Sequence, residues 1–299
     1  MLKKIDYKWK AFSAVGMSLV TMVMSMSMTA VALPSIAEYL EISLQVVSWV
    51  VIANALTITA VLLPFGRLSD LLGRKFFLCG GLFVFLIGSI MCMLSNSIII
   101  LVFSKVIMGI GGAMAQSVGT AIVVSIFIRH ERGKGIGSQT TAVAIGGAIG
   151  PVVAGLILQF FEWQALFLAM FIMASISFIW AFLVLDDSKI GSFQTKDRKF
   201  DWVGAILSGI VMFSLVISIN NPFDGFLFYF VTFFFISCFF IFLFLFIIVE
   251  KRSESPIIDL NLFLEPVFRY ASITRVIGFV GRSSLFLLLP VYLINIRNL

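Results

Sequence analysis

The chain has 299 residues, of which 61% are hydrophobic and 12% charged, and its formal net charge is +6. This composition excludes an ordinary soluble domain, in which about a quarter of the residues are charged. Apolar runs of about 20 residues favour membrane-spanning helices over the short alternating strands of a β-barrel. The bases stand in short segments between these runs, so the positive charge does not indicate nucleic-acid binding.

Nine apolar runs are long enough to cross a bilayer as helices, so the sequence predicts an all-α polytopic transmembrane bundle. Seventeen of the 21 bases fall in segments on one side of these runs, and only Arg297 falls on the other. The positive-inside rule therefore places the N-terminus in the cytoplasm and the chain in the cell membrane as a multi-pass protein. The first run exceeds the core of a signal peptide, about 7–15 residues, and is interpreted as an uncleaved span. The predicted spans are 11–33, 47–65, 76–94, 98–122, 136–158, 163–185, 202–220, 226–249 and 270–293.

A charged island separates the second and third spans, and we expect it to form a tight cytoplasmic loop. Its two glycines permit a sharp turn, and its acid is favoured near the start of the next helix. The spacing G-x-x-x-D-x-x-G-R-K resembles the loop between helices 2 and 3 of the major facilitator superfamily. The resemblance implies a cytoplasmic latch. Its residues are Gly66, Arg67, Asp70, Gly73, Arg74 and Lys75.

Span 136–158 carries small residues at four-residue spacing together with a proline. The spacing predicts close contact with a neighbouring helix, and the proline predicts a bend. A generic glycine-rich membrane helix is the alternative interpretation. The pattern G-x-x-x-G-P resembles the antiporter motif of the same superfamily, which implies an exporter. Its residues are Gly146, Gly150, Pro151 and Gly155.

The first span ends with V-A-L-P at 31–34, which resembles fourteen-span drug:proton antiporters of this superfamily. Those proteins carry an acid nine residues before the proline, where this chain has Ser25. The resemblance makes Ser25 a candidate coupling position, and its substitution for the acid departs from the family pattern. The surrounding Met/Ser stripe, 24–28, predicts either adaptable packing or a substrate surface.

Lys105 stands inside span 98–122, where the family has an arginine. An ionised lysine within a membrane costs about 2.5–3.5 kcal/mol on insertion scales, so such a residue normally faces a wet cavity. The alternative is a lysine that extends to the membrane surface. The glycines that follow Lys105 predict close helix packing and favour the cavity. The spans hold Lys105, Arg275 and Arg282 but no acid, which predicts a neutral or anionic substrate, or acids supplied by other helices.

After the sixth span, 200–207 resembles the start of a helix pair inserted between the halves of fourteen-span exporters. Span 270–293 resembles the first helix of a second bundle and carries Arg282, a third cavity or coupling candidate. We expect this chain to be incomplete, and to insert into the membrane without transporting alone. The predicted divisions are a six-helix bundle (1–185), a cytoplasmic linker (186–201), the inserted pair (202–249), a cytoplasmic loop (250–269) and the start of a second bundle (270–299).

The resemblance implies a secondary active transporter, with proton-coupled efflux of drugs or small molecules by alternating access. A truncated, non-transporting membrane remnant or partner subunit is the alternative. An enzyme is disfavoured because no constellation of acid, histidine and thiol groups lies near a span. We therefore assign no catalytic residue, and expect no metal, nucleotide or other cofactor. The expected partners are the lipid bilayer, an amphipathic small molecule and protons, with no nucleic acid, and the expected state is a monomer.

Overall fold

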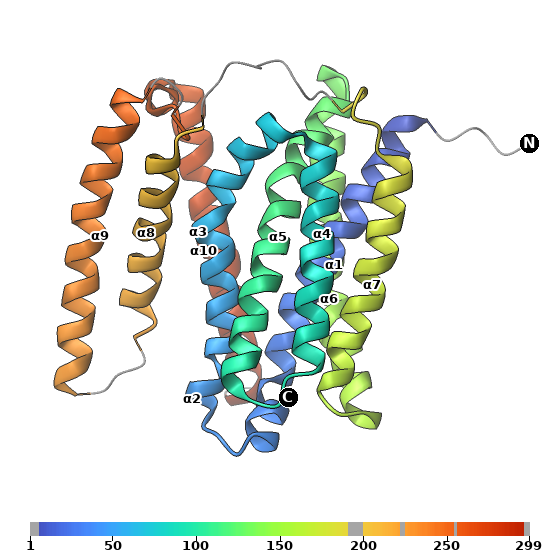
Figure 1. Cartoon of the computed structure of the whole chain (residues 1–299), viewed down its shortest axis with the longest axis vertical. Helices are drawn as coiled ribbons and strands as arrows, with labels where there is room; N and C mark the ends of the chain where they lie inside the picture. The colour runs from blue at the N-terminus through green and yellow to red at the C-terminus, as the bar shows by residue number, and fades with distance from the viewer. Residues whose placement is uncertain (1–5, 191–199, 222–224, 254–255, 296–299) are drawn as a thin grey trace, which may run out of the picture.

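The computed structural model describes residues 6–190, 200–221, 225–253 and 256–295, with side chains as far as Gly281. Long helices stand side by side in one bundle (Figure 1). Among the described residues, eight helices are long and apolar enough to cross a membrane, namely α1 and α3 to α9. The prediction of an all-α transmembrane bundle is therefore confirmed. The elements are α1 (Tyr7–Tyr39), α2 (Leu44–Val47), α3 (Trp49–Leu72), α4 (Arg74–Met93), α5 (Ile98–Ile126), η1 (Arg129–Glu131), α6 (Arg132–Phe160), α7 (Gln164–Val184), α8 (Trp202–Ile219), α9 (Phe226–Arg252), η2 (Leu260–Leu264) and α10 (Pro266–Asn295).

Helices α1 and α3 to α7 pack around one core, and glycines bring their backbones together. A Cβ added to Gly81 of α4 would lie 2.7 Å from the carbonyl oxygen of Gly111 in α5. A Cβ on Gly109 would lie 3.1 Å from the carbonyl oxygen of Asn54 in α3. A Cβ at Gly81 would overlap the α5 backbone, and one at Gly109 would be tighter than ordinary van der Waals contact, so glycine is favoured at both positions. The close packing predicted for the glycines of span 98–122 is confirmed.

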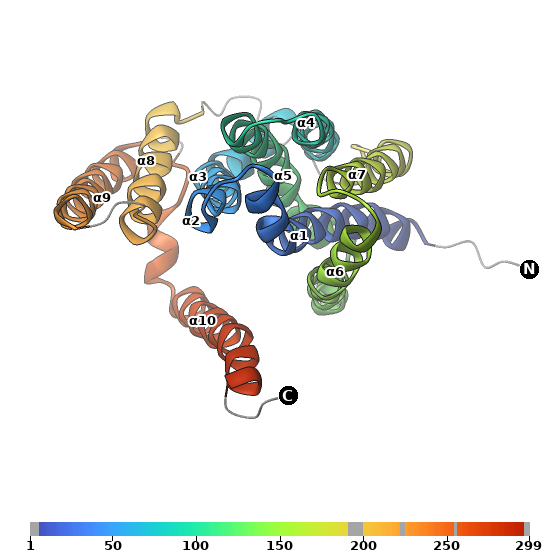
Figure 2. The ribbon, with the colours of Figure 1, turned by 90° about the horizontal axis from the view of Figure 1, so that it is seen from below.

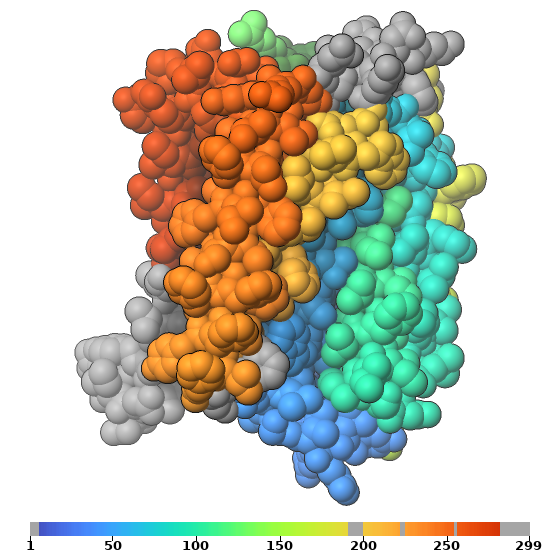
Figure 3. Space-filling model, turned by 60° about the vertical axis from the view of Figure 1, so that its left-hand side comes forward, coloured from blue at the N-terminus to red at the C-terminus, as the bar shows by residue number. Residues whose placement is uncertain are grey.

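The α8–α9 pair lies beside this six-helix unit and joins it through α8, which packs on α3. The Asp201 side chain accepts a hydrogen bond from the Gly204 amide at 2.8 Å and so caps the start of α8. Figure 3 shows α8 between α9 and the rest of the bundle. The phenylalanine-rich α9 leaves most of its side chains on the outside.

Helix α10 stands apart from the bundle (Figure 2), and its main contact is with η2. It contains the predicted ninth span, 270–293, but it is not among the eight apolar helices. The side chains of its second half, including that of Arg282, lie outside the described residues. The ninth span therefore stays a prediction.

The predicted loop at 66–75 is wrong for most of its length. Helix α3 continues to Leu72, and α4 begins at Arg74. Gly73 alone breaks the helix, with φ 105° and ψ 135°, which is a glycine conformation. Gly66 is an ordinary helical residue, and its carbonyl accepts the Ser69 hydroxyl at 2.6 Å. Polar residues can therefore continue an apolar helix past the membrane boundary, because the backbone bonds do not depend on side-chain polarity.

Other helices also extend beyond their apolar runs. Helix α1 continues through Pro34 to Tyr39, and α9 continues to Arg252. Asp70 and Glu250, assigned to loops from the sequence, lie instead in the last turns of α3 and α9. The span limits predicted from hydropathy mark the apolar part of each helix rather than its ends.

Candidate functional site

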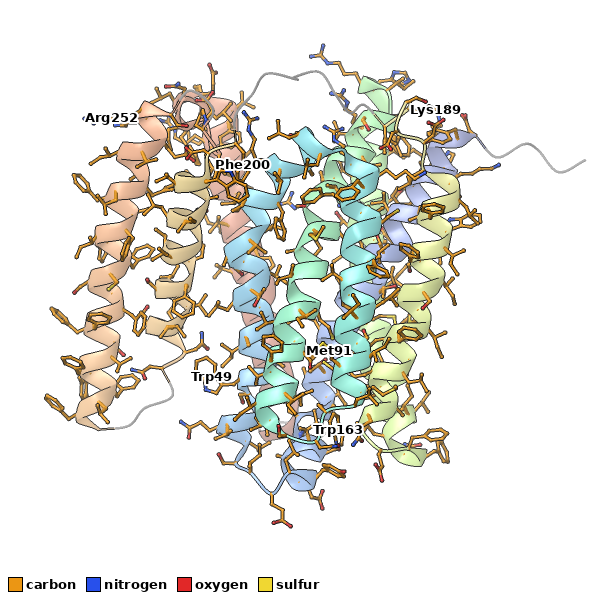
Figure 4. The ribbon with its side chains drawn as sticks, viewed as in Figure 1. Trp49, Met91, Trp163, Lys189, Phe200 and Arg252 are labelled. Atoms are coloured by element: carbon orange, nitrogen blue, oxygen red, sulfur yellow. The ribbon has the colours of Figure 1, made fainter. Side chains whose placement is uncertain are left out.

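Arg74 joins three parts of the chain at the end of the bundle where α1 begins, which we call the basic end. Figure 1 shows this end at the top; it holds Lys8, Arg74 and Arg132, at or near the starts of α1, α4 and α6, and Lys189, which Figure 4 labels. The Arg74 guanidinium lies 3.2 Å from the Asp70 carboxylate, across the break at Gly73. It also donates to the carbonyls of Ala121, at 3.3 Å, and Ile190, at 3.1 Å. One side chain therefore connects the α3–α4 turn to α5 and to the segment after α7.

The remaining residues of the predicted latch do not converge on this point. Lys75 places its ammonium 5.2 Å from the centre of the Phe182 ring in α7. Gly66 has no atom within 4 Å of an added Cβ. Arg67 interacts electrostatically with Glu250, at the end of α9. The structure thus brings Asp70, Gly73 and Arg74 together and directs the other three elsewhere.

Lys8 and Glu131 form a second contact at the basic end, which the sequence did not predict. Their charged atoms lie 2.8 Å apart and connect α1 to the turn before α6. Nearby, the Tyr7 hydroxyl accepts a hydrogen bond from the Asp186 amide at 3.0 Å. The two charges are visible in the sequence, but a separation of 123 residues gives no signal that they meet. A solvent-accessible pair of this kind contributes little to stability, because water screens the two charges.

Lys105 is buried in the six-helix unit, with 1% of its surface exposed. Its ammonium donates to the Thr29 hydroxyl of α1 at 2.7 Å and lies 4.8 Å from the centre of the Phe167 ring of α7. The side chain therefore reaches neither the membrane surface nor an open cavity in this structure. Among the described ion pairs, none includes Lys105. The lysine is a cation held by one hydroxyl and one aromatic face.

Ser25 lies one helical turn before Thr29 and is 3% exposed. Its carbonyl accepts the Thr29 hydroxyl at 2.7 Å, so Ser25, Thr29 and Lys105 form one hydrogen-bonded series. Met24 and Met28 are buried beside them. These three positions of the Met/Ser stripe serve packing, as one of its two interpretations predicted. The Thr29 hydroxyl thus connects Lys105 to the backbone carbonyl of Ser25, and both residues are coupling candidates.

Two glycines of the antiporter-type motif face α1. A Cβ on Gly146 would lie 2.9 Å from the Val20 carbonyl oxygen, and a Cβ on Gly150 would meet the Ser27 hydroxyl. Gly155 has no atom within 4 Å of an added Cβ, so it is not part of this contact. Pro151 lies inside α6, which continues past it to Phe160. The predicted close helix contact is confirmed at two of the three glycines, and its partner is α1.

Glu250 is a buried carboxylate that sequence reasoning missed, because it closes an apolar run next to two bases. It is 3% exposed and accepts the backbone amides of Ile257 and Ile258 at 3.0 Å. This contact fixes the chain where it turns away from α9. In the described α-helices, acids occur only in the last turns, at Glu38, Asp70 and Glu250, whereas Lys105 and Arg275 lie further inside.

Among the described residues, no group of three or more His, Cys, Asp or Glu side chains is placed to hold a metal ion. The site therefore consists of packed helices, the buried Ser25–Thr29–Lys105 series and the contacts of the basic end.

Residues 15–299 match the family model described as Major Facilitator Superfamily. The chain belongs to the major facilitator superfamily. Two solved structures of the family share the fold. The human organic anion transporter MFSD10 has a TM-score of 0.54 and 16% identity, covering 73% of this chain and 58% of its own. A bacterial homologue of the human lysosomal transporter Spinster has a TM-score of 0.50 and 18% identity, covering 66% of this chain and 47% of its own.

Sequence relatives in the superfamily carry several different names. The riboflavin transporter RibZ of Clostridioides difficile is 30% identical over 292 residues, which are 98% of this chain and 62% of RibZ. The multidrug resistance protein Stp of Mycobacterium tuberculosis is 27% identical over 287 residues, which are 95% of this chain and 52% of Stp. The chain thus spans about half to three-fifths of the length of these relatives.

Proposed function

We propose that this chain supplies one moving body of a secondary active transporter that exports a small organic molecule by alternating access. The observation that carries the proposal is the close packing of the six-helix unit of a major facilitator chain. Glycine contacts join α4 to α5 and α1 to α6, and Arg74 joins the α3–α4 turn to α5. Packed in this way, the unit can tilt as a whole, as one bundle does against another in this mechanism.

We further propose that the substrate is neutral or anionic. Lys105 is a buried cation without an ion-pair partner among the described residues. The described acids lie at helix ends or between helices, so the middle of these helices offers no carboxylate to a cationic drug. The relatives named for riboflavin and for multidrug resistance leave the compound itself open.

We also propose that Lys105 is the residue that couples transport to protons. Ser25 has replaced the acid of the fourteen-span drug:proton antiporters that the sequence resembles, and a serine hydroxyl does not titrate in the physiological range. A buried lysine can change protonation state when its surroundings change. The position of Lys105, one hydroxyl from Ser25, supports this assignment.

The experiment compares two proteins in proteoliposomes under an imposed pH gradient. One is this chain, and the other is this chain extended by the second-half helices of RibZ. We expect the extended protein to transport riboflavin or an organic anion, and its Lys105→Met variant to lose the dependence on the gradient. Transport of a lipophilic cation such as ethidium in preference to both would contradict the proposed substrate class.

A membrane subunit that folds without transporting is the second candidate. The observation in its favour is that the six-helix unit packs without α10, whose main contact is η2. If neither protein moves any solute while both insert and remain folded, this second candidate replaces the transporter proposal.

A further inference from the structure

A pocket of about 670 Å³ opens at the basic end, where α1 begins and α7 ends. Its polar lining comes from Tyr7 and Lys10 of α1, Lys75 of α4, and Asp186, Asp187 and Lys189 of the segment after α7, and the stretch from Leu183 to Leu185 completes the wall. Figure 4 shows Lys189 at this end of the bundle, opposite the end that carries Trp163. The pocket takes no part in the transport function proposed above.

The pocket holds three lysines and two acids, Asp186 and Asp187, and no described ion pair joins Lys10 or Lys75 to either acid. Asp186 is already engaged, because it accepts the Ser188 amide at 3.1 Å and hydroxyl at 2.7 Å, and Lys189 lies 3.3 Å away. These hydrogen bonds, with Lys189, hold the pKa of Asp186 below its usual range. Lys10 and Lys75 have no carboxylate within ion-pair distance among the described residues. Two ammonium groups are therefore available to an anion.

The pocket continues into an apolar surface that faces the membrane. Leu183 is 71% exposed and Phe182 is 58% exposed, beside the Lys75 ammonium. Further along the same pair of helices, the Phe83 ring of α4 lies 6.2 Å from the Phe178 ring of α7. Figure 2 shows α4 and α7 on the outer side of the bundle, away from α10. Charge at the rim and aromatic rings along the helices match a molecule with an anionic head and hydrocarbon tails.

We propose that this pocket binds an anionic phospholipid of the adjoining leaflet, with its phosphate between Lys10 and Lys75. The acyl chains lie along the aromatic surface of α4 and α7. Basic pockets between helices at a membrane face recognise anionic headgroups, and each lysine near such a surface contributes about 1 kcal/mol. A soluble anion would bind the same two lysines, but it would make no contact with the exposed aromatic rings.

The test measures lipid retained by the purified protein in native mass spectrometry, with phosphatidylglycerol and phosphatidylcholine offered at equal concentration. We expect wild type to retain phosphatidylglycerol in preference. Lys10→Gln/Lys75→Gln should lower that preference about 30-fold, which is about fivefold for each lysine. Lys134→Gln/Lys251→Gln is the matched control, because it removes the same charge from exposed lysines outside the pocket. The control should behave as wild type.

Two outcomes overturn the proposal. One is equal loss of phosphatidylglycerol preference in both double variants, and the other is displacement of the lipid by millimolar inorganic phosphate, which would indicate a soluble-anion site. If Lys10→Gln/Lys75→Gln fails to fold, a crosslinking experiment on the wild-type protein tests the same site. A photoactivatable phosphatidylglycerol with its reactive group in the acyl chain should crosslink to α4 or to the end of α7. Crosslinking confined to other helices rejects the site.

Discussion

The contact between α6 and α1 predicts a specific cost for one added methyl group. In Gly146→Ala the new Cβ would lie 2.9 Å from the Val20 carbonyl oxygen and 3.2 Å from the Val20 Cα. Both are backbone atoms, so no side-chain rotation relieves the overlap. Overpacking of this kind costs about 1–3 kcal/mol, while alanine gains about 0.5–1 kcal/mol over glycine in a helix. The net expectation is a loss between about 0 and 2.5 kcal/mol.

Gly155→Ala is the matched control, because it is the same substitution in the same helix and meets no atom within 4 Å. The difference between the two variants isolates the overpacking cost, about 1–3 kcal/mol. For a protein of this size it corresponds to melting temperatures about 2–10 °C apart. The assay is thermal unfolding of each purified variant in detergent, read by tryptophan fluorescence. Equal melting temperatures, or a more stable Gly146→Ala, would refute the inferred helix contact.

Three further predictions concern the charged groups. Arg74→Ala removes the contacts to Asp70, Ala121 and Ile190, so it should lower the melting temperature by several degrees. Arg129→Ala is the control, because Arg129 is exposed and has no described contact, and it should leave the melting temperature unchanged. Lys105→Met should be neutral or stabilising by about 1–4 kcal/mol, because it removes a buried charge. Thr29→Val should destabilise the protein, because it leaves that charge without its hydrogen-bond acceptor. A higher melting temperature for Thr29→Val than for Lys105→Met would contradict the inferred burial. In a variant without native cysteines, an impermeant thiol reagent added outside cells should label a cysteine at Glu38 and not one at Arg132, and the opposite pattern would reject a cytoplasmic N-terminus.

The sequence predicted the helices well, because the long apolar runs mark them directly. It misplaced the residues that border those runs. Gly66 and Asp70 were expected in a loop because glycine and charge are typical of turns, yet both continue α3 and only Gly73 adopts a conformation that breaks the helix. Glu250 was missed for a similar reason, since its amide partners, Ile257 and Ile258, follow a turn that hydropathy does not reveal.

The candidate site was predictable as a set of residue types but not as an arrangement. Lys105 stands out because a lysine within an apolar run is costly. That its acceptor is Thr29 depends on how α1 packs against α5, which no local pattern specifies. The pairing of Lys8 with Glu131 is equally invisible, because it joins residues far apart in the chain. In contrast, the glycines of α5 and α6 allowed close helix contacts to be predicted from the sequence, because small residues are enriched at the interfaces between membrane helices.

Helix α9 has a consequence for the membrane that surrounds it. Its 27 residues span about 40 Å, at about 1.5 Å per residue, whereas the hydrocarbon layer is about 30 Å thick. Most of its phenylalanines lie on the outside, so the other described helices make few contacts that would fix its tilt. Its tilt should therefore follow the thickness of the bilayer. Because Glu250 holds Ile257 and Ile258, a change in that tilt moves the chain that leads to α10.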